Sequence, residues 1–370
     1  MSFQEFVKSR RVVICCGSGG VGKTTVSAAI AVRAATEGRK TLVLTIDPAR
    51  RLADSLGLAE LGNRASRVAL GPDAKGELWG MMLDVKRTFD DLVDRIAPNA
   101  ETRDRILRNH YYQQVVGALA GSEEYSAMEK LYEIAGDTDY DLIVLDTPPT
   151  KHALDFLDAP RRMIEFLDGK VVQWFVKPYL LAGKMGFRFA QKGAEIIFKV
   201  LEKGTGYQTL ADLSEFFLAF DGLYDGFKAR AGAVQRLIAD PETVFVVVTT
   251  PRHPAVDEAA YFRDRLVEKR LPIGAVVFNR VHEPLWTGDP DAALAAVESA
   301  LDDIPAEYAP LVDALADLSA DLDRVAAAEG EVMSGFLARI PDIDLVARIP
   351  ALAVDVHDVA GLAVVGRHLA

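Results

Sequence analysis

The sequence has only two cysteines among its 370 residues, and these are adjacent, Cys15 and Cys16. Two neighbouring cysteines cannot form a disulfide framework, and they are too few for an all-cysteine zinc or iron–sulfur site within one chain. Uncharged apolar runs of about 18 residues, which a membrane-spanning helix needs, are also absent. Residues 1–11 show no apolar segment followed by a small-residue cleavage site. We therefore expect a soluble protein of the reducing cytoplasm.

Basic side chains are the minority, with 42 Lys and Arg against 54 Asp and Glu and a formal net charge of −12. Such a surface repels nucleic acid and anionic lipid, so we expect no nucleic-acid partner, and any anion site must be local. A hydrophobic content of 50% excludes a disordered chain. The length fits two or three domains of about 150 residues, or one large α/β core that carries an insertion.

Short apolar runs alternate with helical patterns in two blocks, residues 11–150 and 242–280. The runs that predict strands are residues 12–16, 41–46, 79–85, 142–145, 244–248 and 273–278, with a last strand at residues 344–349. Residues 24–36 predict the first long helix. Continuous apolar strands alternating with helices indicate an α/β fold with a mainly parallel sheet flanked by helices.

Residues 154–240 separate the two blocks and carry apolar side chains at helical spacing, for example Phe216, Phe217 and Phe220. We interpret this stretch as a helical insertion, so that residues 1–153 and 241–370 form the first and second parts of one core. Two readings remain open for its aromatic residues. They are either ordinary core residues or part of an apolar surface that docks another protein.

A glycine-rich segment directly follows the first predicted strand and directly precedes the first long helix. Residues 17–24 match the pattern G-x-x-x-x-G-K-[ST]. In this context the glycines let backbone N–H groups point toward a phosphate, and the helix N-terminus adds partial positive charge. Lys23 would reach the β- and γ-phosphates, and the Thr24 hydroxyl would bind Mg²⁺. The segment therefore predicts a nucleotide-binding phosphate loop.

Two carboxylates come at the ends of predicted strands. Asp146 follows the apolar residues 142–145, as in the Walker-B arrangement that holds Mg²⁺, and the alternative is a cap for the next turn. Asp47 follows the second strand, where it either orients the attacking water or caps a helix that Pro48 begins. The residues alone do not decide between the two roles of Asp47.

Together these segments resemble one family. The matching motifs are residues 17–25, Asp47-Pro48-Ala49, the string Asp146-Thr147-Pro148-Pro149-Thr150 with His152, Leu154 and Phe156-Leu157, and Asn279. They are similar to the P-loop, switch I, switch II and adenine-contact motifs of the arsenite-pump ATPases and of the ATPases that target tail-anchored membrane proteins. The switch II string separates this family from the ParA/MinD partition and division-site ATPases, which share the phosphate loop but not this switch II.

The resemblance implies a P-loop NTPase fold and a dimeric ATPase that closes around ATP and Mg²⁺. Asp47 would position the water, Asp146 and His152 would sense the γ-phosphate, and Thr24 with Asp146 would hold the metal. The nucleotide-binding residues would be Gly17, Gly19, Gly20, Val21, Gly22, Lys23, Thr24, Thr25 and Asn279. The helical insertion would lie above the nucleotide and would bind a hydrophobic protein client or a membrane partner.

The sequence departs from the family at Ser18, where the family's loop usually carries a second lysine that reaches across the dimer. Arg50, Arg51 and Lys151 are candidates to supply the missing charge. The alternatives are that these are ordinary surface charges, and that a related ATPase supplies the lysine in a heterodimer in place of a homodimer.

The leading hypothesis is a cytoplasmic ATPase whose nucleotide state alters a helical surface for a client or partner. The first alternative is the catalytic subunit of an anion or metalloid efflux pump. The family's arsenite-binding and zinc-binding cysteines are missing, however, and Cys15 and Cys16 fall inside a predicted strand. The second alternative is a ParA/MinD-like positioning ATPase, but residues 355–370 lack a Lys-rich amphipathic helix.

Overall fold

The computed structural model describes residues 1–47, 51–110, 112–113, 122–136, 139–147, 158–159, 161–162, 165, 223–284, 309–340 and 343–369. Its centre is an eight-stranded sheet in the order β3-β4-β2-β5-β1-β6-β7-β8. The strands are β1 (Val12–Cys16), β2 (Lys40–Thr45), β3 (Ser66–Val68), β4 (Glu77–Met82), β5 (Leu142–Asp146), β6 (Thr243–Thr249), β7 (Ile273–Val281) and β8 (Leu345–Pro350). Every pairing is parallel except that of β3 with β4. The predicted α/β fold with a mainly parallel sheet is confirmed.

The strands of both sequence blocks belong to this one sheet. β1 lies between β5 and β6, and its first residue, Val12, is in register with Ile143 on one side and Thr243 on the other. Because β1, β2, β5, β6 and β7 run parallel, their carboxyl ends lie at the same edge of the sheet. That edge is where α/β sheets place their ligands.

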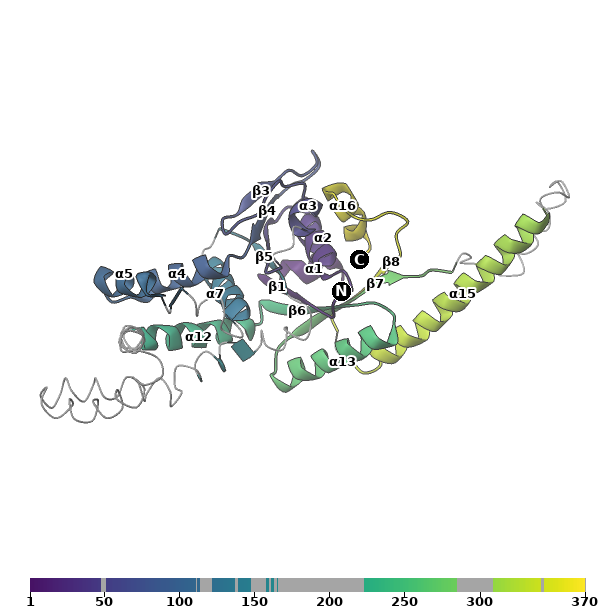
Figure 1. Ribbon diagram of the computed structural model, residues 1–370. Coiled ribbons are helices and arrows are strands. Elements are labelled where there is room, and N and C mark those ends of the chain that lie inside the picture. The colour runs from purple at the N-terminus through teal and green to yellow at the C-terminus, as the bar shows by residue number, and fades with distance from the viewer. Residues whose placement is uncertain are drawn as a thin grey trace, which may run out of the picture.

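Helices cover both faces of the sheet (Figure 1). One layer contains α1 (Phe3–Lys8), α2 (Lys23–Thr36), α3 (Arg51–Ser55) and α16 (Val359–Arg367). The other contains α7 (Ser122–Gly136), α12 (Tyr224–Ile238), α13 (His253–Glu268) and α15 (Ala309–Leu337), with α4 (Val85–Ile96) and α5 (Ala100–Arg108) beside α7. In β1, Val13 and Cys15 face the first layer, while the alternate residues face the second. A strand buried on both faces needs an unbroken apolar run, which explains why residues 12–16 are all apolar.

Two details of the sheet differ from the sequence prediction. The third predicted strand, residues 79–85, ends in the structure at Met82, because Asp84 caps α4 by accepting a hydrogen bond from the Arg87 N–H at 3.0 Å. β3 was not predicted. It has three residues and pairs antiparallel at the edge of the sheet, so it is too short to show an alternating pattern.

The predicted insertion falls largely outside the described residues, since of residues 154–240 the structure describes mainly its end, α12. Arg230 of α12 forms an ion pair with the buried Glu129 of α7, and its guanidinium lies 4.4 Å from the centroid of the Tyr132 ring. The boundaries at residues 153 and 240 therefore stay predictions. α12 itself is anchored to the helix that precedes β5.

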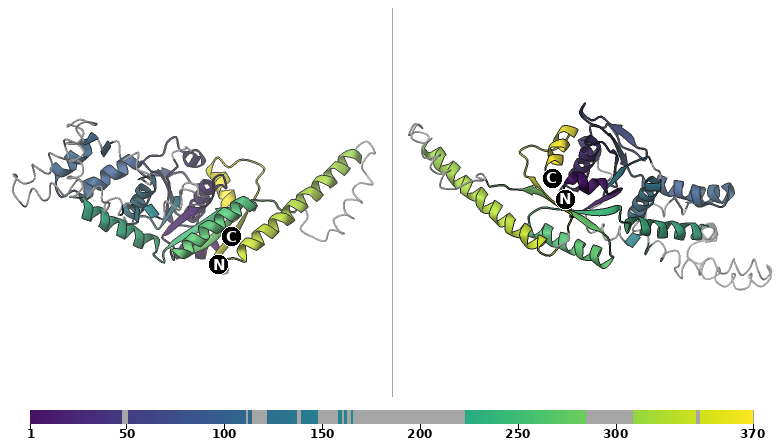
Figure 2. Two further views of the ribbon diagram at one scale, coloured as in Figure 1. Left: turned by 60° about the horizontal axis from the view of Figure 1, so that its bottom comes forward. Right: turned by 180° about the vertical axis from the view of Figure 1, so that it is seen from behind.

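α15 runs beyond the end of the sheet and projects from the body of the molecule (Figure 2). The helix is long, but acidic residues interrupt its apolar sequence. Within the described segments, every helix falls short of the combined length and apolar character that crossing a bilayer requires.

Candidate functional site

The glycine-rich loop connects β1 to α2 at the carboxyl edge of the sheet. A Cβ atom at Gly17 would lie 2.0 Å from the carbonyl oxygen of Val248 in β6, so no larger residue fits there without moving the strand. Gly22 has φ +92°, a left-handed conformation that favours glycine, and a Cβ there would lie 2.2 Å from Nδ2 of Asn279. These two positions fix the shape of the loop from both ends.

Lys23 begins α2 and is 7% exposed. Its Nζ donates a hydrogen bond to the carbonyl oxygen of Ser18 at 2.8 Å, so the side chain folds back across its own loop. Burial lowers the pKa of Lys23, and the nearby carboxylates of Asp146 and Asp47 oppose that shift. The ammonium group is thus bonded to the loop and is within reach of the charges of two carboxylates. Thr25, the third residue of the helix, is half-buried.

Asp146 ends β5 and is 1% exposed. Its Oδ2 accepts hydrogen bonds from the Thr24 hydroxyl at 2.7 Å and from the Thr45 hydroxyl at 3.0 Å, and Oδ1 lies 3.5 Å from the Ser27 hydroxyl. Burial raises the pKa of Asp146 to about 6, although both threonine hydroxyls and Lys23 act to lower it. A buried carboxylate beside a threonine hydroxyl is an oxygen donor set of the kind that Mg²⁺ prefers.

The Thr45 hydroxyl gives a test of this network. Thr45→Val keeps the shape of the side chain but removes one hydrogen bond to a buried carboxyl, so we expect the nucleotide-free protein to lose about 1–3 kcal/mol of unfolding free energy. Thr41→Val is a matched control, because Thr41 is a buried residue of the same strand whose hydroxyl makes only a 3.4 Å contact with the Arg39 carbonyl. Denaturant unfolding measures both variants, and equal losses would contradict the role given to Thr45.

Asp47 follows β2 and is half-buried. Its backbone N–H donates to the Thr45 hydroxyl at 3.2 Å, and the same hydroxyl donates to Asp146. Arg51, the first residue of α3, is exposed and close enough for its charge to lower the pKa of Lys23. The remaining candidates for the switch segments, Arg50, Lys151 and His152, lie outside the described residues.

Asn279 lies near the end of β7, two strands from β1, and is 8% exposed. Its Nδ2 donates a hydrogen bond to the carbonyl oxygen of Val21 in the phosphate loop at 2.8 Å, and its Oδ1 accepts the backbone N–H of Arg280 at 3.0 Å. The structure thus brings Asn279 to the loop, and the predicted contact with adenine stays a prediction.

Sequence reasoning missed Thr45, Ser27 and the contact between Asn279 and Val21. The position of Thr45 near the end of the predicted strand at residues 41–46 was the available signal, because the end of a parallel strand lies at the carboxyl edge of the sheet. Ser27 lies one helical turn after Lys23, on the buried side of α2. No sequence pattern indicated the hydrogen bond between Asn279 and Val21, which lie on elements two strands apart in the sheet.

The two cysteines lie in β1 and are fully buried. Burial raises the pKa of the Cys15 thiol to about 12 and raises that of Cys16 as well. Both therefore remain protonated and packed in the core. Among the described residues there is no group of three or more His, Cys, Asp or Glu side chains that could hold a metal ion.

Comparison with known proteins gives a family match and several relatives. The family model for the anion-transporting ATPases matches residues 10–285. The chain is 27% identical over 302 residues to the ATPase GET3B of Arabidopsis thaliana, covering 76% of this chain and 67% of that protein. It is 26% identical to an ATPase ASNA1 homolog of Cryptosporidium parvum, covering 83% and 76%. It is 23% identical to a putative arsenical pump-driving ATPase of Aquifex aeolicus, covering 73% of this chain and 63%, less than two thirds, of that protein.

The family match includes the whole of the phosphate loop together with Asp47, Asp146 and Asn279, and it extends over more than half of the chain. The structure brings the described parts of these motifs to one edge of the sheet. The chain therefore belongs to the ArsA family of anion-transporting ATPases and is an ATPase.

Proposed function

We propose that the chain binds ATP together with Mg²⁺ as a dimer and uses hydrolysis to switch the state of the helical insertion at residues 154–240. That insertion would present an apolar surface to a hydrophobic protein client or partner. The observation that carries the proposal is the 2.7 Å hydrogen bond between the Thr24 hydroxyl and the buried carboxylate of Asp146, beside the ammonium group of Lys23.

Each residue of this cluster has a task that follows from its chemistry. Thr24 and Asp146 would hold Mg²⁺, which when bound neutralises the charge of the phosphate oxygens. The glycines of the loop offer backbone N–H groups at the N-terminus of α2, where an anion is favoured. Lys23 is already held over the loop by the carbonyl of Ser18, so it needs little reorganisation to reach a phosphate.

Asp47 would orient the attacking water and accept its proton. Thr45 connects this residue to the metal carboxylate, because its hydroxyl accepts from the Asp47 N–H and donates to Asp146. A movement of the segment after β2 would therefore alter the surroundings of Asp146 directly. This hydrogen-bond chain supports a switch that senses the γ-phosphate.

The insertion is attached to the site at both of its ends. Its proposed beginning follows Asp146 by only eight residues along the chain. At its other end, α12 packs on α7 through Arg230 and Glu129, and α7 leads into β5, the strand that carries Asp146. A change at Asp146 can thus reach the insertion through the backbone and through α7.

Metalloid transport receives no support from the cysteines of this chain. An arsenite site needs accessible thiolates, whereas Cys15 and Cys16 are buried in β1 as thiols. The proposed function therefore includes the nucleotide-dependent switch but not the transport of a metalloid.

Hydrogen exchange tests the coupling. We expect residues 165–230 to differ in amide protection between the ADP complex and the complex with a non-hydrolysable ATP analogue, because one state exposes more of the apolar face. β3, at the far edge of the sheet, is the internal control and should exchange equally in both states. The Lys23→Ala variant should lose the difference. Identical protection of residues 165–230 in both complexes would make the insertion purely structural.

A further inference from the structure

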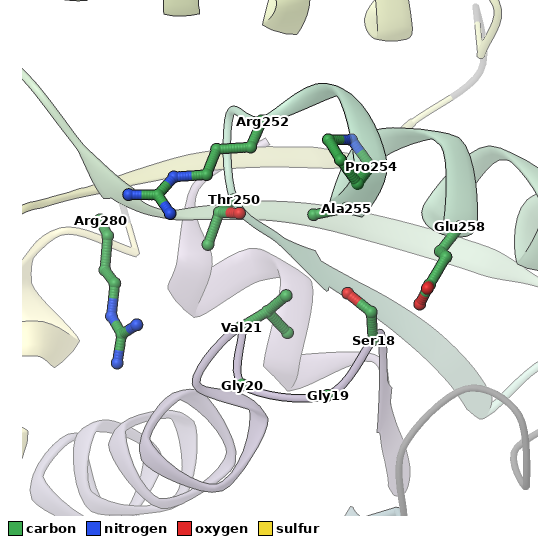
Figure 3. Close-up of a pocket in the computed structure, with 10 residues that line it drawn as sticks. All are labelled: Ser18, Gly19, Gly20, Val21, Thr250, Arg252, Pro254, Ala255, Glu258 and Arg280. Carbon is green, nitrogen blue, oxygen red and sulfur yellow. The ribbon is translucent and has the colours of Figure 1, made fainter.

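A pocket of about 450 Å³ lies beside the phosphate loop, between the loop and the N-terminus of α13 (Figure 3). Ser18, Gly19, Gly20 and Val21 line it on the side of the loop, and Arg252, Glu258 and Arg280 contribute its charged groups. Lys23 and Thr24 are not among its lining residues, so the pocket is distinct from the cluster around Asp146. Figure 3 shows the guanidinium groups of Arg252 and Arg280 at the same end of the pocket, with Glu258 at the other end near Ser18.

The two arginines have no charged partner in the described part of the chain. Within the described residues, the side chains of Arg252 and Arg280 take part in no ion pair and in no other side-chain interaction. Both are exposed. Although Glu258 lies at the other end of the pocket, the two arginines that pair with no acid leave a local positive charge at their own end.

The N-terminus of α13 adds to this charge. Arg252 is the N-cap residue of this 16-residue helix, its side chain makes no capping hydrogen bond, and the first turn contains no acidic residue. The first N–H groups of the helix therefore receive neither a side-chain cap nor an acidic residue of the first turn. Glycine backbone, two guanidinium groups and a helix N-terminus together favour an anion with several oxygens.

The backbone of Arg280 is unusual in a way that points to the same conclusion. Among the described residues, Arg270 with φ 56° and Arg280 with φ 60° have left-handed backbone conformations. Arg270 follows the end of α13, where left-handed residues are common, and the Leu271 N–H bonds back to the Leu266 carbonyl. Arg280 lies within β7 at the point where the pairing with β8 shifts register between Asn279 and Val281, so it forms a bulge in the strand, and bulges are frequent next to active sites. Left-handed residues with a Cβ are unfavourable and concentrate at functional sites.

Asn279 explains how the conformation of Arg280 is held. Its Oδ1 accepts the Arg280 N–H at 3.0 Å while its Nδ2 donates to the Val21 carbonyl at 2.8 Å. One buried amide thus ties the left-handed residue to the phosphate loop. The backbone of Arg280 is in this way fixed relative to Val21, which lines the pocket together with Arg280.

We propose that Arg252 and Arg280 bind the phosphate tail of a nucleoside triphosphate beside the loop, and that they provide the positive charge that Ser18 lacks. The inference rests on the proposed function. The triphosphate comes either from the nucleotide bound to the same chain or from the nucleotide of a second copy in the dimer. Arginine suits both sources, because its planar fork bonds two phosphate oxygens at once.

The test uses the full chain and three variants: Arg252→Ala, Arg280→Gly and the double variant. Glycine at position 280 keeps the left-handed backbone without strain while it removes the guanidinium. Arg270→Gly is the matched control, since it makes the same change at the other end of β7, away from the pocket. ATP affinity, ATP turnover and thermal unfolding are measured for each protein. We expect the double variant to lose on the order of 10²-fold in turnover or in ATP affinity, and Arg270→Gly to behave as wild type.

Mixing experiments separate the two sources. The double variant is combined with the Lys23→Ala variant, which has both arginines but cannot hold its own nucleotide. Recovery of turnover in the mixture means that the arginines act on the nucleotide of the second copy, and no recovery means that they act on their own. A folded double variant with wild-type turnover and ATP affinity would overturn the inference while leaving the proposed function intact. A wild-type protein that fails to bind ATP would instead overturn the proposed function.

Discussion

The Lys23→Ala variant is expected to lose tight ATP binding. Lys23 would make charge-assisted hydrogen bonds to two phosphates, at roughly 1.5–3 kcal/mol each. Two such bonds correspond to a loss in affinity of roughly 10²- to 10⁴-fold. The side chain is 7% exposed and already lies over the loop, bonded to the Ser18 carbonyl at 2.8 Å.

Equilibrium titration with ATP in the presence of Mg²⁺ measures this loss, and thermal unfolding checks that the variant is folded. Lys86→Ala is the control, because Lys86 is exposed on α4 and pairs with Asp90. Its ATP affinity should equal that of the wild type. If the Lys23→Ala variant bound ATP with wild-type affinity, the phosphate loop would not be the nucleotide-binding site.

The Asp47→Asn variant is expected to bind ATP normally and to hydrolyse it about 10²-fold or more slowly. The amide keeps the shape and the hydrogen-bonding capacity of the side chain but cannot take a proton from water. The backbone N–H of residue 47 can still donate to the Thr45 hydroxyl, so the contact with the Asp146 network is preserved. The loss should therefore appear in kcat and not in affinity.

Single-turnover hydrolysis, with ATP affinity measured alongside, separates these quantities. Asp54→Asn makes the same change on the exposed side of α3 and should turn over like the wild type. If Asp47→Asn hydrolysed ATP at the wild-type rate, Asp47 would instead have the structural role of a helix cap, the alternative that the sequence allowed.

The strands of the sheet were predictable because their signal is local. A strand buried on both faces, such as β1 or β6, needs apolar residues at every position, and that run is visible without any knowledge of the fold. β3 was missed because an edge strand of three residues has little burial to impose a pattern. The end of β4 was misplaced because Leu83 and Val85 are apolar and continue the run, whereas the chain turns into α4 at Asp84.

The phosphate loop and its two aspartates were also determined by the sequence. Gly17, Gly22 and Lys23 have fixed spacings within one short loop, and the Lys23 ammonium bonds to the carbonyl of Ser18 only five residues earlier. Asp146 and Asp47 each follow an apolar strand. In a parallel sheet this alone places both at the carboxyl edge. These relations are set by the periodicity of the strands and need no tertiary information.

What only the tertiary structure decided are the contacts between elements far apart in the chain. Thr45 joins Asp146 across 101 residues, and Asn279 reaches Val21 across 258. Arg252 and Arg280 line the same pocket beside the loop. Their placement there depends on the order of β1, β6 and β7 in the sheet and on the left-handed backbone of residue 280. Strand order and backbone handedness are set by the packing of the whole sheet against its helices, and a local pattern of residues carries no record of either.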